Sequence, residues 1–231
     1  MNKEEITKWK IVKTTNFKRI YEVLLDAYEF SLLYCLIGFS GAGKSTAFRT
    51  FIQEHKDVFY LRLDKTYTRK DLYVALLRCF DEHEYGYDIP VRFLAIRLSD
   101  LINARPGKVL IILDDAGRFS AAHIEYLQSI FDANEGKLGL VLSGTSKFSN
   151  DFKEWVRTEE QGIPELDTRI HEWVYLQRPS ASELKSVASM NGITSAADLT
   201  QIAKGCNNFR TLRARVIDIR KEKLKQKSSA K

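Results

Sequence analysis

A short segment near the amino end of this 231-residue chain places the strongest constraint on its fold. An apolar run of strand length, residues 32–37, leads directly into a glycine-rich segment, Gly38-Phe39-Ser40-Gly41-Ala42-Gly43-Lys44-Ser45-Thr46. Apolar residues then recur at helical spacing, at Ala47, Phe48, Phe51 and Ile52. The sequence therefore predicts a buried strand, a tight loop and a helix in immediate succession.

The loop matches the pattern G-x-x-x-x-G-K-[ST], which binds the phosphates of a nucleotide. Its glycines allow backbone N–H groups and the helix amino end to point at a polyphosphate. Lys44 is predicted to contact the β- and γ-phosphates, and the Ser45 hydroxyl to ligate Mg²⁺. The predicted nucleotide-binding residues of the loop are Gly38, Ser40, Gly41, Ala42, Gly43, Lys44, Ser45 and Thr46.

Composition and sequence pattern narrow the expected cellular location. Apolar runs are too short to cross a bilayer, the amino end has no signal-peptide pattern, and the three cysteines lack zinc spacing. We therefore expect a cytoplasmic protein without a membrane partner. The net charge of +6 is uneven, because residues 204–231 hold ten Lys or Arg against two acidic residues.

Strand and helix patterns alternate up to residue 178, which predicts an α/β fold. Strands are expected near 32–37, 58–63, 109–113, 138–142 and 173–176, in a five-stranded, mostly parallel sheet between helices. Three short helices are expected after Pro179. We predict a P-loop ATPase domain over 1–178, a small helical lid over 179–220 and a basic tail over 221–231.

Acidic residues stand where the third predicted strand ends. Asp114 is expected to hold Mg²⁺, directly or through water, and Asp115 lies where a water-activating carboxylate would sit. Ser143 ends the next buried strand. Since parallel strands end at one edge of a sheet, we expect Gly38, Asp114 and Ser143 to converge there.

The order of these motifs resembles an AAA+ ATPase. The set comprises the phosphate loop, Asp114-Asp115, Ser143-Gly144-Thr145, Thr168-Arg169-Ile170 and Asn207-Asn208-Phe209-Arg210. It is most similar to the transposition-regulator branch, the phage MuB and TnsC type, over roughly residues 14–220.

That resemblance implies several roles. Ser143 or Thr145 takes the sensor-1 place, Arg210 the sensor-2 place, and Thr15 and Phe17 lie where relatives wall the adenine. Arg169 falls where relatives present an arginine finger to a neighbouring subunit, with Arg157 as a rival. Asp115 departs from the glutamate usual in the family, and this shorter carboxylate predicts slow hydrolysis.

The resemblance also implies DNA as a partner. The candidates for contacts with DNA phosphates are Lys65, Arg69, Lys70 and Arg92. Contacts with phosphates would bind DNA without regard to its base sequence. The predicted function is an ATP- and Mg²⁺-dependent regulator of transposition that forms a ring or filament on double-stranded DNA and recruits or stimulates a transposase. Two alternatives remain, a signalling or chaperone-like AAA+ ATPase acting on protein and a small P-loop kinase.

Overall fold

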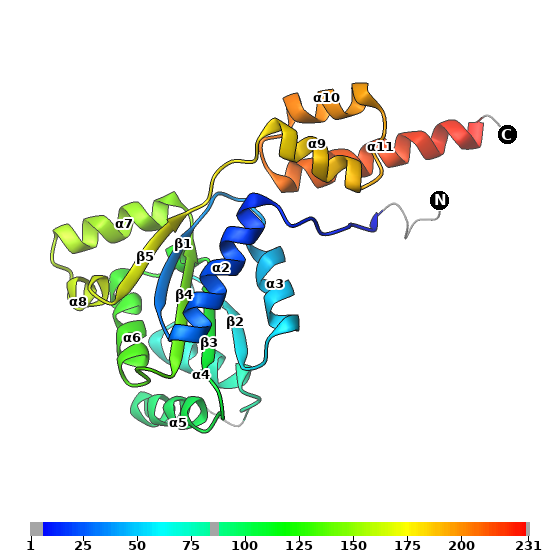
Figure 1. The fold of residues 1–231 in the computed structure, drawn as a ribbon. Helices are drawn as coiled ribbons and strands as arrows, with labels where there is room; N and C mark the ends of the chain where they lie inside the picture. The colour runs from blue at the N-terminus through cyan, green and yellow to red at the C-terminus, as the bar shows by residue number, and fades with distance from the viewer. Residues whose placement is uncertain (1–6, 84–87, 230–231) are drawn as a thin grey trace. The chain divides into compact units, whose positions relative to one another are not determined.

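The computed structural model describes residues 7–83 and 88–229. Their elements, in chain order, are α2 (Thr15–Phe30), β1 (Leu33–Ile37), α3 (Lys44–Glu54), β2 (Val58–Arg62), α4 (Arg69–Cys79), α5 (Val91–Asn103), β3 (Val109–Asp114), the 3₁₀ turn η1 (Ala116–Arg118), α6 (Ala121–Asp132), β4 (Leu138–Gly144), α7 (Ser146–Arg157), α8 (Ile163–Asp167), β5 (Ile170–Tyr175), α9 (Ala181–Met190), α10 (Ala196–Gly205) and α11 (Phe209–Ser229) (Figure 1). No helix in this described part has the length and apolar composition needed to span a bilayer.

The chain divides into two compact units. One, here called the sheet unit, comprises residues 20–39 and 47–176. The other, here called the lid unit, combines residues 1–19 and 177–231 with residues 40–46 of the phosphate loop. The loop therefore belongs to the same compact unit as the carboxyl-terminal helices, a grouping that linear order along the chain does not reveal.

The sheet unit contains five parallel strands in the order β2-β3-β4-β1-β5. The predicted five-stranded α/β sheet is thus confirmed. Strands β1, β3 and β4 are buried along their whole length, which explains their continuous apolar sequences. The edge strand β5 is mostly exposed and carries an irregularity beside β1, between the pairs of Leu33 and Tyr34.

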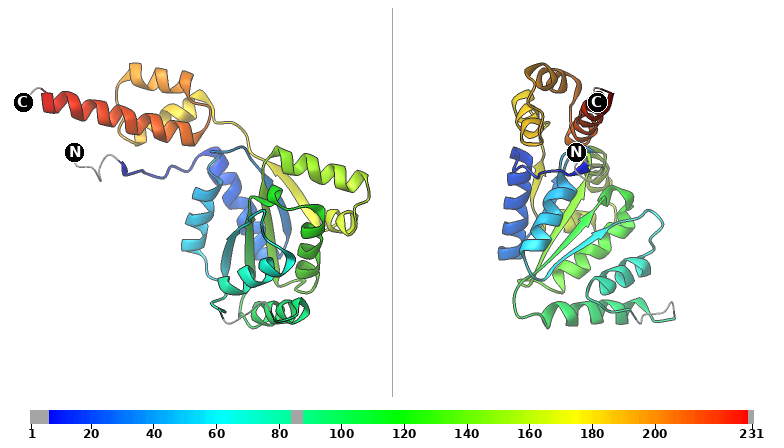
Figure 2. Two further views of the ribbon diagram at one scale, coloured as in Figure 1. Left: turned by 180° about the vertical axis from the view of Figure 1, so that it is seen from behind. Right: turned by 90° about the vertical axis from the view of Figure 1, so that its right-hand side faces the viewer.

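Helices cover both faces of this sheet (Figures 1 and 2). On one face, α4 to α8 contribute to a large apolar cluster with the inward side chains of the strands, such as Leu33, Ile111 and Leu140. The other face carries α2 and α3, whose buried residues include Leu24 and Phe48. This two-sided cover leaves the strand ends as the places where polar side chains can collect.

The lid unit has its own apolar core. Residues of α9, α10 and α11, including Leu184, Ile202 and Leu212, pack together, and Trp9 and Val12 of the amino-terminal segment pack against them. Ser180 and Ser195 cap α9 and α10 by accepting hydrogen bonds from Glu183 N–H and Asp198 N–H, as their sequences predict. Helix α11 continues to Ser229, so the described part of the basic tail is helical.

Gly139 in β4 permits close packing of α2 on the sheet. A Cβ atom there would lie 2.0 Å from the carbonyl oxygen of Ala27 in α2. We expect Gly139→Ala to lower the free energy of unfolding by about 3 kcal/mol, because backbone, and not a movable side chain, blocks the added methyl group. Chemical denaturation measures this loss. Gly107→Ala is the control, since nothing lies within 4 Å of its Cβ position; equal stability of the two variants would contradict the prediction.

Candidate nucleotide site

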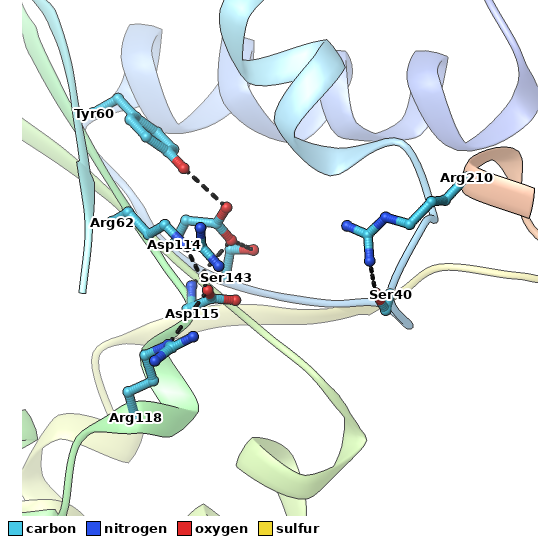
Figure 3. A network of polar contacts seen from close by, with 8 residues as sticks. All are labelled: Ser40, Tyr60, Arg62, Asp114, Asp115, Arg118, Ser143 and Arg210. Atoms are coloured by element: carbon cyan, nitrogen blue, oxygen red, sulfur yellow. Dashed lines mark hydrogen bonds and ion pairs between the residues drawn. The ribbon is translucent and has the colours of Figure 1, made fainter. Parts of the chain in front are cut away.

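The phosphate loop is shaped by two glycines with left-handed backbone conformation. Gly41 has φ +85° and Gly43 has φ +98°, values that other residues rarely adopt. Lys44 is the first residue of α3, so the loop ends at a helix amino terminus where backbone N–H groups point outward. Figure 3 shows this loop at Ser40, with α3 following it. The local structure is thus the one that the sequence predicts for binding phosphate.

The start of α11 lies directly on the loop, within the lid unit. The Phe209 N–H donates to the Gly41 carbonyl at 3.0 Å, and Arg210 Nη1 donates to Ser40 Oγ at 2.5 Å (Figure 3). A Cβ atom on Gly41 would lie 2.6 Å from Asn208 Oδ1. The structure therefore brings Arg210 together with the phosphate loop.

The amino-terminal segment is attached to the same lid. Asn191, which is buried, pairs with both backbone groups of Lys10, at 2.8 and 3.2 Å. Arg220 donates to the carbonyls of Lys8 and Asn191. The Asn16 side chain bonds both backbone groups of Gln177 and donates more weakly to the Ala42 carbonyl. The segment before α2 is therefore held in place by hydrogen bonds between lid side chains and its backbone groups.

These attachments enclose an apolar pocket. Its walls are contributed by the amino-terminal segment, the phosphate loop and the lid helices, with the lining residues Trp9, Ile11, Val12, Thr14, Phe17, Gly43, Thr46, Val187 and Phe209. Such a surface suits a flat aromatic base next to a phosphate-binding loop. Phe17, a candidate for contact with the adenine, is one of these lining residues. Thr15 is not among the lining residues; its N–H donates to Glu183 Oε1 at 2.6 Å.

A second polar cluster lies at the strand ends of the sheet unit (Figure 3). Asp114, only 4% exposed, accepts hydrogen bonds from Ser143 Oγ and from the Asp115 N–H on Oδ1, at 2.8 and 3.0 Å. Its Oδ2 accepts from Tyr60 Oη at 3.1 Å. Three donors thus orient the carboxylate. Burial and then the Asp114 charge raise the pKa of Tyr60 to about 12, so this hydroxyl remains a donor at neutral pH.

Asp115 has a different environment. It adopts φ +61°, and its Oδ2 accepts from Arg62 Nε at 2.8 Å and is 3.4 Å from Arg118 Nε. Both arginines are substantially exposed. Asp115 also raises the pKa of Arg62, mainly through this hydrogen bond. The carboxylate that was predicted to activate water is therefore engaged by two cations.

The other predicted residues are more scattered. Thr145 is the N-cap residue of α7 without a side-chain cap bond, and the strand-end polar contact comes from Ser143. Arg169 Nε donates to Asp132 at 2.9 and 3.1 Å, a bond that lowers the pKa of Asp132. Arg157 is paired with Glu154 at its own helix end. Both candidate arginine fingers thus have acidic partners within the chain.

The DNA candidates also differ in position. Lys65 lies exposed in the loop after β2, and Arg69, at the start of α4, rests over the Tyr126 ring at 4.5 Å. Lys70 is half-buried in α4. Arg92 is instead in α5, with its guanidinium over the Phe93 ring. In Figure 2, α5 lies toward the sheet edge where the strands begin, away from the loop after β2.

Mg²⁺ is compatible with this donor set. In the described parts of the chain, no group of three or more His, Cys, Asp or Glu side chains forms a metal site. Mg²⁺ in phosphate-binding proteins needs only one or two protein oxygens beside the phosphate oxygens of the substrate. Ser45 in the lid unit and the well-oriented Asp114 in the sheet unit each carry an oxygen of that kind.

The loop, the sheet and the strand-end carboxylates define a P-loop nucleotide-binding protein. The family described as the AAA domain matches residues 31–151, and the chain belongs to this family. Its cofactors are accordingly ATP and Mg²⁺. No curated protein matches the sequence significantly.

Solved structures that are similar in fold include three archaeal proteins. The ORC1 protein of Aeropyrum pernix, solved in complex with DNA, has a TM-score of 0.64 at 15% identity, over 94% of this chain and 62% of that one. Cdc6p from Pyrobaculum aerophilum has 0.66 at 13%, over 95% and 64%. The Walker-type ATPase of Pyrococcus abyssi has 0.59 at 14%, over 97% and 79%. This chain thus spans less than two thirds of the first two proteins.

Gly41 allows a direct test of the loop geometry. We expect Gly41→Ala to weaken binding of a fluorescent ATP analogue more than tenfold, since alanine is strained at φ +85° and its methyl group would meet the Asn208 side chain. Titration of the analogue measures this. Gly205→Ala, at the end of α10 with open space around its Cβ position, should bind as the unaltered chain does. Normal affinity in Gly41→Ala would show that the loop tolerates the added group.

Proposed function

We propose that this chain hydrolyses ATP slowly and that its ATP-bound form assembles on double-stranded DNA without sequence preference. We further propose that this assembly regulates transposition by recruiting or stimulating a transposase. The ATPase part of this proposal rests on the match to the AAA family and on the oriented Asp114 carboxylate that accompanies the phosphate loop. The order of motifs supports the finer assignment to transposition.

Each site residue has a proposed role. Lys44 and the loop N–H groups bind the phosphates, while the apolar pocket receives the base between Phe17 and Phe209. Ser45 and Asp114 would hold Mg²⁺, which would neutralise phosphate charge. Ser143 and Tyr60 keep the Asp114 carboxylate in one orientation. Arg210 holds the lid on the loop through Ser40.

Asp115 is the proposed base for the attacking water. Arg62 and Arg118 both contact its Oδ2, so they compete with the attacking water for this oxygen. This arrangement supports slow hydrolysis in the isolated chain. In the assembly, Arg169 is proposed to exchange Asp132 for the phosphates of a neighbouring subunit, with Arg157 as the rival candidate.

Asp115 and Arg62 should therefore have opposite effects on turnover. We expect Asp115→Ala to lower the ATP hydrolysis rate by about 10²-fold or more, because it removes the base. Arg62→Ala should raise the rate up to about fivefold, since an exposed ion pair no longer competes for the carboxylate. Phosphate release under saturating ATP measures both. ATP affinity should not change in either variant, and a slower Arg62→Ala enzyme would contradict this role.

DNA binding is supported by the exposed Lys65, in the loop after β2, and the exposed Arg69, at the start of α4. Hydrogen bonds from Thr66 lower the pKa of Asp64, and the charges of Arg118 and Lys65 lower it further. The Aeropyrum pernix ORC1 protein, solved with DNA, shares this fold. Exposed lysine and arginine side chains that meet phosphates displace counterions, which makes such binding strongly dependent on salt.

Plasmid sedimentation tests the proposed function. We expect the chain to co-sediment with DNA in the presence of a slowly hydrolysed ATP analogue and to remain in the supernatant without it. Lys65→Ala or Arg69→Ala should each lower the slope of log affinity against log salt by about one. Lys56→Ala, an exposed lysine before β2, should leave it unchanged. Sedimentation that is independent of nucleotide would refute the assembly switch, and no DNA binding would favour a protein substrate.

A further inference from the structure

Helix α5 carries large apolar side chains on its outer face. Phe93 is 49% and Ile96 is 57% exposed, and they stand three residues apart on one helix. The other exposed large apolar residues of the described chain lie singly, at Ile11 before α2, Phe30 in α2, Tyr175 in β5 and Met190 in α9. Single exposed apolar residues are ordinary, but neighbouring ones on an outer helix indicate a surface that contacts another molecule.

The inner face of α5 is already occupied. Leu94, Leu98 and Ile102 are buried in the large apolar cluster of the sheet unit. Because an α-helix turns about 100° per residue, Phe93 and Ile96 fall on the side away from these three. Figures 1 and 2 show α5 as an outlying element at one end of the sheet unit. Packing within this unit therefore does not account for the exposed pair.

Opposite charges flank Ile96 at equal spacing on this outer face. Arg92 stands four residues before it and Asp100 four residues after it, and both are exposed. The Arg92 guanidinium lies over the Phe93 ring, and neither Arg92 nor Asp100 forms an ion pair within residues 7–83 and 88–229. An arc of about 100° on the helix holds Arg92, Phe93, Ile96 and Asp100. The two charged residues are about 12 Å apart along the helix axis.

This pattern is complementary to itself. When two copies of α5 lie antiparallel about a two-fold axis through Ile96, each Arg92 faces the Asp100 of the other copy, and Ile96 faces Ile96. A two-fold contact has this property, because every pairing occurs twice. A small crossing angle, as in antiparallel helix pairs, keeps both charge pairs within reach over this length. Phe93 then extends the apolar area beside the axis.

We propose that α5 is a self-association surface, at which two copies of this chain pair through antiparallel α5 helices in the absence of nucleotide and DNA. The contact is separate from the proposed ATP-dependent assembly. It is smaller than a standard interface, which buries about 1,600 Å² in total, so the dimer is weak and concentration-dependent. Phe93 and Ile96 supply the apolar area, and the charge pairs fix the antiparallel register.

Charge exchange tests this geometry by sedimentation velocity on the full chain without nucleotide, over roughly 10 to 500 μM. The unaltered chain should form dimers. Arg92→Asp and Asp100→Arg should each raise the dimer dissociation constant more than tenfold, because like charges then face each other twice. An equimolar mixture of the two variants should dimerise again, since every facing pair becomes one Asp and one Arg.

Further variants serve as controls. Lys153→Asp on α7 makes the same type of charge change at an exposed site outside α5 and should leave dimerisation intact. Ile96→Asp should abolish it without rescue by mixing. A monomeric unaltered chain, or a mixture that fails to restore dimers, overturns the proposal. If Arg92→Asp reduces retention on DNA and leaves dimerisation unchanged, Arg92 is a nucleic-acid contact and the proposal is likewise wrong.

Discussion

The parallel register of the sheet is the constraint on which the polar site depends. Leu113 of β3 pairs with Leu142 of β4, so the next residues, Asp114 and Ser143, emerge at the same level and meet in a hydrogen bond of 2.8 Å. Arg62 of β2 is level with Asp114 and reaches Asp115 from the other side. A shift of the strand register by one residue would turn these side chains to the opposite face of the sheet, and the polar cluster would not form. Apolar burial of the strands thus positions the polar chemistry at their ends.

Much of the fold could be predicted because its signals are local. The apolar strand before the loop, the continuous run 109–113 and the serines that cap α9 and α10 each specify structure within a few residues. The pairing of Asp114 with Ser143 followed from the general rule for the ends of parallel strands. The strand order and the grouping of the loop with the lid depend on long-range packing, which has no such local signal.

For the same reason, the site predicted from the sequence does not include every residue that the structure places there. Tyr60 and Arg62 belong to a half-buried edge strand, where a tyrosine or arginine is ordinary, and only the register of β2 beside β3 gives them a role. Trp9, Val187 and Phe209 are far apart in sequence and share one pocket only through the lid unit. The ion pairs of Arg169 and Arg157 with acidic side chains likewise have no signal in the sequence. The candidates for DNA contact also lie on separate elements, with Arg92 on α5 and Lys65 in the loop after β2.

The left-handed backbone of Asp115 bears on why this position departs from the usual glutamate. Aspartate is several times more common than most residues at positive φ, because its short side chain tolerates that conformation. A longer side chain there would extend the carboxylate toward water and at the same time strain the turn that follows β3. In the proposed role as base, the reach of the side chain toward water and an unstrained backbone therefore favour different residues at this position.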